Sequence, residues 1–307
     1  MANGDEGQTP SETKQSYGFI KDDISNGKRV SIIYFTLGTF LLSYSLWAIV
    51  ILGQRLGWFA ADNPWAMLSY ILGGNIPPIV AYLTFKRADP GFTLKKYLKN
   101  AFDFKQKPLY YGLTALLVAV YFIVPALMGG LSTEAAQGLE ARGVSDHIPL
   151  YLTLLGIPIF FFGGGSEELG WRGLLQPELE KRMHFIPATI ITGTIWTLWH
   201  LPLWFIPSTG QSEINFGFFF IMVMGLSFGL ATIRRLSGSV LLCVLFHCAV
   251  NSLNGTWPIK DELPIKIVTT LVYIALAVTI VYWQEKKKKA LPTPELSGPA
   301  HNAGSLR

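Results

Sequence analysis

Eight long apolar stretches constrain the fold of this chain more than any other feature of its sequence. A helix needs roughly 17 to 25 mostly apolar residues to cross the hydrocarbon core of a bilayer. Only 15% of the 307 residues are charged, whereas soluble domains carry about 25% charged residues. The sequence therefore predicts an all-α fold, a polytopic transmembrane helix bundle of about eight spans. The stretches lie at Val30–Leu52, Trp65–Phe85, Leu109–Met128, Pro149–Gly165, Phe185–Phe205, Phe216–Ile233, Val240–Leu253 and Pro264–Trp283.

The positions of the Lys and Arg residues indicate how these spans lie in the membrane. Eight spans place both termini on one side, and 21 of the 25 Lys and Arg residues then fall in the tails and loops of that side. The four on the other side are Arg55, Arg142, Lys260 and Lys266. Cytoplasmic loops of membrane proteins carry such an excess of positive charge. We therefore expect a multi-pass protein of the cell membrane with both termini cytoplasmic.

Composition divides the chain into one membrane domain, residues 30–284, and two tails. Residues 1–29 are polar, and residues 285–307 are basic and then rich in Pro, Ser and Gly, so we expect both segments to be disordered cytoplasmic tails. An amphipathic interfacial helix is expected in the stretch Lys95–Lys107. The Lys286–Lys289 run is explained by anchoring at the inner face, where it can contact anionic membrane lipid. We expect no nucleic-acid partner, and the sequence leaves the oligomeric state open.

Ionisable side chains within apolar segments are costly, so by default they indicate function. The first group is Glu167, Glu168 and Arg172, which follow a run of three glycines and a serine. On a helix, Glu168 and Arg172 are four residues apart and can pair. Glu167 is rotated by about 100° from Glu168, has no obvious local partner and is suited to act as a general base. The alternative is a helix end at which two acids and an arginine reach the aqueous boundary.

Two further polar groups lie in later apolar segments. His200 ends a segment that contains Trp196 and Trp199. A lone His is more often a packed, hydrogen-bonded residue than a ligand, and the Trp residues are explained by packing or by a membrane-interface belt. His247 and Asn251 are four residues apart and share a helical face. They can stabilise a developing oxyanion, or they can hydrogen-bond neighbouring helices, as His and Asn often do in membranes.

Together, the three groups indicate hydrolysis of an amide bond. If their spans pack side by side, two carboxylates, an arginine, two imidazoles and an amide gather in one wet cavity, where Glu167 can take a proton from water. Zinc is an alternative, with Glu167, His200 and His247 as its ligands, because two imidazoles, a carboxylate and a water form a known catalytic set. The sequence contains neither a His-Glu-x-x-His motif nor a Gly-x-Ser-x-Gly motif, which argues against the protease classes built on them.

These motifs resemble those of the CAAX-processing and bacteriocin-processing intramembrane protease family, also called the Abi family. The matching core covers residues 149–253, and the sequence around the two glutamates is most similar to the prokaryotic branch. The resemblance implies an intramembrane endopeptidase of all-helical fold whose site opens to the cytoplasmic side. The motifs stand in the order of that family: Glu167-Glu168-x-x-x-Arg172, Trp196-x-x-x-His200 and His247-x-x-x-Asn251.

The resemblance also implies roles for these residues and a class of substrate. The substrates are membrane-associated proteins or peptides, with prenylated CAAX-type proteins among the candidates. The family has been described both as metalloproteases and as metal-free glutamate proteases, so the sequence leaves the metal open. The implied roles are water activation by Glu167 and His200, support from Glu168 and Arg172, and an oxyanion site formed by His247 and Asn251.

For Glu167 and His200 to meet, they must lie at the same depth in the membrane. His200 lies near the outer end of the fifth span, whereas Glu167 lies near the inner end of the fourth. We therefore predict that the fourth helix continues past Leu175 toward Lys181, which brings Glu167 toward the middle of the membrane and Arg172 below it.

Two other functions remain open alternatives. The first is a non-catalytic bacteriocin-immunity or scaffold protein of the same fold, which would tolerate Glu167→Gln. The second is a transporter whose buried carboxylates relay protons. A transporter would show helices broken by Gly or Pro in both halves of the chain, and Asn75-Ile76-Pro77-Pro78 and Pro125 do not form such a pair.

Overall fold

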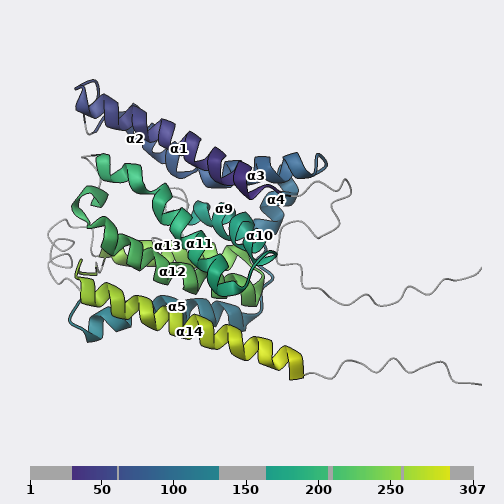
Figure 1. Cartoon of the computed structure of the whole chain (residues 1–307). Coiled ribbons are helices and arrows are strands. Elements are labelled where there is room, and N and C mark those ends of the chain that lie inside the picture. Colours follow the sequence, from purple (N-terminus) through teal and green to yellow (C-terminus); the bar gives the residue numbers. More distant parts are fainter. Residues whose placement is uncertain (1–29, 61, 131–163, 207–209, 257–258, 291–307) are drawn as a thin grey trace, which may run out of the picture.

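The computed structural model describes residues 30–60, 62–130, 164–206, 210–256 and 259–290. In this part of the chain, helices and the loops that join them make up the fold (Figure 1), as the predicted all-α helix bundle requires. The expected tail 1–29 lies outside the described residues. The main helices are α1 (Ile32–Arg55), α2 (Pro64–Gly74), α3 (Ile76–Ala88), α4 (Leu94–Ala101), α5 (Pro108–Leu127), α9 (Glu168–Gly170), α10 (Gln176–Glu180), α11 (Phe185–Trp199), α12 (Phe216–Ser237), α13 (Val240–Thr256) and α14 (Leu263–Ala290).

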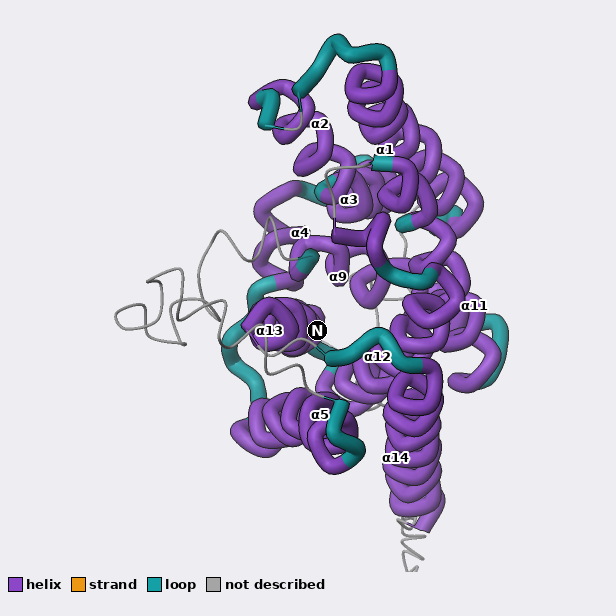
Figure 2. Tube along the Cα trace, turned by 90° about the vertical axis from the view of Figure 1, so that its left-hand side faces the viewer, coloured by secondary structure: helices purple, strands orange, loops and turns teal. Residues whose placement is uncertain are grey.

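The helices form three layers. In Figure 1, α1, α2 and α3 lie on one side, α5 and α14 lie on the other, and α11, α12 and α13 lie between them. Figure 2, turned by 90°, shows the same order. The contacts agree, because α12 packs against both α11 and α14, and α13 packs against α5. The middle layer is therefore shielded on both sides, and it carries two of the three predicted site motifs.

Among the described residues, four helices, α1, α5, α12 and α14, are long and apolar enough to cross a membrane, and the pair α2–α3 makes a fifth if its 46° bend belongs to one span. Helices α11 and α13 contain 15 and 17 residues and are shorter than a full span. The expected fourth span, Pro149–Gly165, lies almost entirely outside the described residues. The chain is a multi-pass membrane protein, and the count of about eight spans stays a prediction.

The outer faces of the bundle suit lipid rather than water. Leu37 and Leu41 of α1 are 58% and 68% exposed, and Leu271 of α14 is 58% exposed. Contiguous exposed apolar side chains on this scale are unfavourable in water, whereas lipid tails solvate them. The polar groups of the predicted site are instead turned toward the middle layer.

The break between α2 and α3 follows from the sequence. Pro77 and Pro78 supply no backbone N–H, so the helix cannot continue through them without losing hydrogen bonds. Asn75 occupies the break, and its side-chain Nδ2 donates to the carbonyl of Ile71 at 2.9 Å. Its Oδ1 accepts from the hydroxyl of Ser166 at 2.6 Å. The break therefore connects the first layer to the residue that precedes Glu167.

The two ends of the bundle differ in their polar contacts. At one end, Arg235 binds Glu180 at 2.5 Å and Glu285 at 2.7 Å, which ties α10, α12 and α14 together. At the other end, the backbone N–H of Asn215, which caps α12, donates to Asp261 at 3.1 Å. The start of α1 and the end of α14 both lie at the Arg235 end (Figure 1).

Two boundaries differ from the sequence prediction. Helix α14 runs to Ala290. The disordered tail expected over residues 285–307 was therefore predicted to begin too early, because residues 285–290 are helical. The reason is that Lys residues are good helix formers and interact favourably with a helix C-terminus. The amphipathic helix expected within Lys95–Lys107 is present as α4, but it ends at Ala101. Tyr97 on its buried face donates to the carbonyl of Pro78 at 3.0 Å.

A close approach between α1 and α2 holds the first layer together and yields the first prediction. A Cβ on Gly73 would lie 2.4 Å from the indole nitrogen of Trp47, which is 1% exposed, whereas a Cβ on Gly74 would meet nothing within 4 Å. Gly73→Ala should therefore lower the free energy of unfolding by about 1–3 kcal/mol through overpacking. The measurement is thermal unfolding of the purified protein in detergent.

Gly74→Ala is the matched control for this prediction. It lies next to Gly73 at the end of the same helix and has open space around it. Because Ala is the better helix former, this change should leave stability equal or raise it by up to about 1 kcal/mol. Equal melting temperatures for the two variants would contradict the proposed packing of α1 on α2.

Candidate active site

The segment that carries the first motif is one continuous helical stretch with an unusual turn. Gly164 has φ 79°, a left-handed conformation that favours glycine, and begins the stretch. A 3₁₀ turn (Gly165–Glu167) leads into α9, then a π-helical turn, η2 (Trp171–Leu175), and α10. The stretch is helical past Leu175 as far as Glu180, as predicted, but it begins after Gly164, and residues 149–163 of the expected fourth span lie outside the described residues. Single π turns inside helices occur frequently at functional sites.

Glu168 and Arg172 form the predicted pair, and it is completely buried. Arg172 Nη1 lies 3.2 Å from Glu168 Oε1 and Oε2, and both side chains are 0% exposed. Arg172 Nη2 donates to the hydroxyl of Ser227 at 3.0 Å. The guanidinium carbon lies 4.6 Å from the ring centroid of Trp196, a distance at which a cation is attracted to the ring. The helix-end alternative, in which these groups reach water, is therefore wrong.

His247 of α13 joins this pair. Its Nδ1 lies 2.8 Å from Glu168 Oε1, so a Glu168 carboxylate accepts a hydrogen bond from the N–H of that nitrogen. The other ring nitrogen, Nε2, lies beside Gly164. A Cβ on Gly164 would be 2.7 Å from His247 Nε2 and 2.9 Å from Glu167 Oε1. The absence of a side chain at Gly164 thus leaves these two functional atoms uncovered.

Glu167 has more partners than the sequence suggested. Its Oε2 accepts from Trp196 Nε1 at 2.7 Å and lies 3.4 Å from Trp171 Nε1. The expectation that Glu167 lacks a local partner is wrong, because Trp171 lies one helical turn further along the same segment. The explanation of Trp196 as only a packing or interface-belt residue is also incomplete. The sequence feature that could have indicated this contact is the spacing of four residues between Glu167 and Trp171, the same spacing as between Glu168 and Arg172.

His200 comes directly after the last residue of α11. Its Nδ1 lies 2.8 Å from the carbonyl oxygen of Trp196. A carbonyl can only accept, so Nδ1 carries the proton and Nε2 of the neutral ring is left as an acceptor. That nitrogen lies 4.0 Å from Glu167 Oε2. The neighbouring Trp199 donates its Nε1–H to Ser43 at 2.8 Å and has the packing role expected for it.

The functional groups meet at a cavity of about 370 Å³. Glu167, His200, His247 and Asn251 all line it, together with Gly164, whereas Glu168 and Arg172 lie beneath the cavity and have no exposed surface. The structure thus brings the three motifs together at one site. The rest of the lining combines apolar and polar side chains: Trp47, Tyr70, Ile71, Gly74, Trp196, Trp199, Leu203, Gln211, Ile214, Phe219, Met222, Val223, Leu226 and Asn254.

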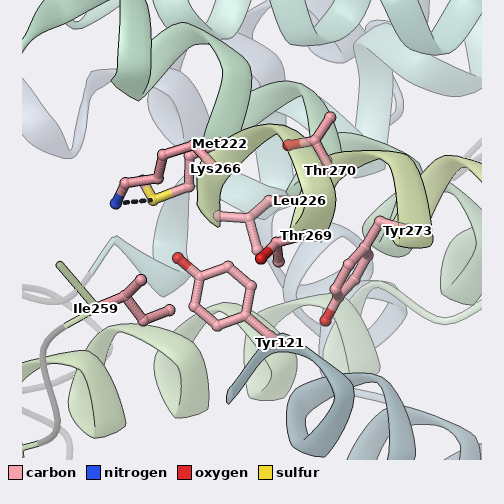
Figure 3. Close-up of a pocket in the computed structure, with 9 residues that line it drawn as sticks. Tyr121, Met222, Leu226, Ile259, Lys266, Thr269, Thr270 and Tyr273 are labelled. Atoms are coloured by element: carbon pink, nitrogen blue, oxygen red, sulfur yellow. Dashed lines mark hydrogen bonds between the residues drawn. The ribbon is translucent and has the colours of Figure 1, made fainter. Parts of the chain in front are cut away.

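A second cavity lies behind the wall formed by Met222 and Leu226 (Figure 3), and these two residues line both cavities. Lys266 points into it, with Nζ 4.0 Å from the sulfur of Met222 and 3.7 Å from Asp261 Oδ1. Its volume is only about 10 Å³, close to the minimum that one water molecule needs. This second cavity is therefore too small to hold a peptide.

The predicted zinc ligands, Glu167, His200 and His247, all line the cavity. In the part of the chain that the structure describes, no group of three His, Cys, Asp or Glu side chains is placed to hold a metal ion. Glu167 Oε2 accepts from Trp196 Nε1 and lies 4.0 Å from His200 Nε2.

Comparisons with known proteins agree with this site. Residues 149–253 match the model of the family described as type II CAAX prenyl endopeptidase Rce1-like. The chain is also 26% identical over 277 residues to the CAAX prenyl protease 2 of Methanococcus maripaludis, an alignment that covers 86% of this chain and 97% of the relative. The matched region contains every motif residue at the cavity. The chain is thus a multi-pass membrane hydrolase whose residues 149–253 are similar to the Rce1-like family of CAAX prenyl endopeptidases.

Proposed function

We propose that this protein is an intramembrane endopeptidase that hydrolyses peptide bonds of membrane-associated proteins or peptides, including prenylated CAAX-type substrates. One observation carries the proposal. The carboxylate of Glu167 and the free Nε2 of His200 lie 4.0 Å apart on the wall of a cavity of about 370 Å³. Two acceptors at that distance can share one water molecule between them.

Glu167 and His200 activate this water. The water donates one hydrogen bond to each acceptor, and Glu167 takes its proton as the oxygen attacks the peptide carbonyl. When the carbon–nitrogen bond breaks, Glu167 returns the proton to the leaving amine. The indole groups of Trp171 and Trp196 hold Glu167 Oε2 in place, so that Oε1 remains free beside Gly164.

His247 and Asn251 stabilise the oxyanion that forms during the attack. They lie one turn apart on α13, and both line the cavity. His247 donates from Nε2 when both ring nitrogens carry protons, while Nδ1 is hydrogen-bonded to Glu168. Glu168 and Arg172 do not reach the cavity, so they are positioning residues that orient His247 and balance its charge.

The orientation in the membrane is part of the proposal. We place the protein in the cell membrane with both termini in the cytoplasm. The distribution of Lys and Arg supports this orientation. So does the position of the start of α1 and the end of α14 at the same end of the bundle (Figure 1).

Glu167→Gln tests the proposed general base. The change keeps the shape of the side chain and removes its ability to take a proton, so kcat should fall by about 10²–10⁴-fold. The measurement is cleavage of a quenched peptide library that includes prenylated peptides, with protein purified in detergent. Glu178→Gln is the control, because Glu178 lies in the same segment but pairs with Lys181 at 2.9 Å. Cleavage by Glu167→Gln at the wild-type rate would contradict this role, whereas equal background from the wild type and the variant would support the non-catalytic immunity or scaffold alternative.

Treatment with a chelator distinguishes activation of water by Glu167 and His200 alone from activation by a bound zinc ion. If Glu167 and His200 activate the water without a metal, cleavage by the wild type should persist after treatment with a strong chelator. Loss of cleavage that added zinc restores would instead assign these three residues to a metal. The same peptides and the same preparation serve for both measurements.

Trp196→Phe tests whether the indole N–H positions the base. The change keeps an aromatic ring and removes the hydrogen bond to Glu167 Oε2. A hydrogen bond to a charged group is worth about 1.5–3 kcal/mol, so kcat should fall by about 10–100-fold, with KM little changed. Trp199→Phe is the control, since its N–H binds Ser43 instead, and it should lower stability more than kcat. Equal kcat in Trp196→Phe and the wild type would contradict this role.

A further inference from the structure

A groove of about 300 Å³ lies at the Arg235 end of the bundle, apart from the two cavities described above. It is formed where the end of α10 and the start of α11 face α14, and Arg235 of α12 is also in its wall. Among the described residues, none lines both this groove and the active-site cavity. The groove, called the Arg235 groove, therefore has no part in the proposed reaction.

One part of the Arg235 groove is apolar. Phe185 and Ile186 line it from α11, and Val278, Val281 and Tyr282 line it from α14. Ile186 and Tyr282 remain 45% and 62% exposed. Exposed apolar side chains that gather in one place mark a surface that contacts a partner or the membrane. An apolar chain is therefore the favoured occupant of this part of the groove.

The other part is polar, and its charges are unbalanced. Its lining residues are Glu180, His184, Arg235 and Glu285. Arg235 binds Glu180 at 2.5 Å and Glu285 at 2.7 Å, and Glu180 Oε1 also accepts from Gln176 Nε2 at 2.7 Å. Two carboxylates thus share one guanidinium. The Glu285 side chain is 48% exposed, compared with 12% for Glu180, so Glu285 is the carboxylate that a cationic group can reach.

The two parts of the groove lie on either side of a membrane boundary. The apolar part of α14 ends at Trp283, and Gln284, Glu285 and a run of lysines follow it. Tyr282 and Trp283 are 62% and 60% exposed, and Tyr and Trp are enriched where a membrane meets water. The apolar part of the groove therefore faces the hydrocarbon layer, and Glu285 faces the layer of lipid head groups.

We propose that the Arg235 groove binds a phospholipid whose head group carries a primary amine, with an acyl chain on the apolar part and the ammonium group at Glu285. An ammonium group is compact and offers three N–H donors to a carboxylate. A head group with a net negative charge would instead meet the excess of carboxylate. Lys286 and Lys287 follow Glu285, but they do not line the groove. The inference does not depend on the proposed function.

Glu285→Gln tests the polar part of the groove. Delipidated full-length protein in detergent is titrated with dioleoyl phosphatidylethanolamine or dioleoyl phosphatidylglycerol, and native mass spectrometry counts the lipid molecules that it retains. The wild type should retain one molecule of the amine lipid more tightly than the anionic lipid. Glu285→Gln should weaken retention of the amine lipid by about 2- to 5-fold, as expected for a partly exposed ion pair. The control is Glu262→Gln, an exposed acid that precedes the other end of α14.

Ile186→Trp tests the apolar part, because the larger side chain fills the groove. Tight retention of the amine lipid should be lost. Ile190→Trp is the control, since Ile190 is 44% exposed, lies one turn further along α11 and does not line the groove. The melting temperature of each variant without lipid shows whether it folds, and Glu285→Gln, at an exposed position, carries the test if Ile186→Trp does not.

Three results would overturn the proposal. The first is a wild type that retains no lipid, which would mean that the groove is closed or covered by another part of the chain. The second is tighter retention of the anionic lipid, which would assign lipid binding to the exposed lysines. The third is equal retention of the amine lipid by the wild type and by folded Glu285→Gln or Ile186→Trp.

Discussion

The guanidinium of Arg172 has no exposed surface. The site is organised around the side chains that pair with this buried positive charge. A buried charge is tolerated only when it is paired and hydrogen-bonded. The partners come from different segments: Glu168 from its own helix, Ser227 from α12 and the ring of Trp196 from α11. Glu168 also binds His247 of α13. One buried cation thus fixes the relative positions of four helical segments, and the groups that face the cavity depend on that arrangement.

The pairing of Glu168 determines the role of its neighbour. Because Glu168 is committed to Arg172 and His247, the carboxylate of Glu167 is the one that reaches the cavity. Helices outside the family-matched region complete the site. Asn75 at the break between α2 and α3 accepts from Ser166, and Ser43 of α1 accepts from Trp199. The matched domain carries the reacting groups, and the first layer holds them in position.

Local spacing explains what the sequence could predict, namely the ranges of the long apolar helices, the Glu168–Arg172 pair and the helical run past Leu175. The contacts of Glu167 with Trp196 and of His247 with Glu168 join residues 29 and 79 positions apart, and no local pattern specifies such distances. The motif order indicated that these groups meet, but not which nitrogen of each His is free. That detail depends on the carbonyl of Trp196 and on the carboxylate of Glu168.

The π turn at Trp171–Leu175 has a consequence for how this segment can vary. A π turn accommodates one more residue per turn than an α-helix, so the extra residue is absorbed within the turn and the helix on either side keeps its register. Deleting one of Gly173, Leu174 or Leu175 would restore α geometry there and leave the spacing of Glu167, Glu168 and Arg172 unchanged. The turn is thus a place where the segment can lose one residue while the motif side chains keep the faces that they present.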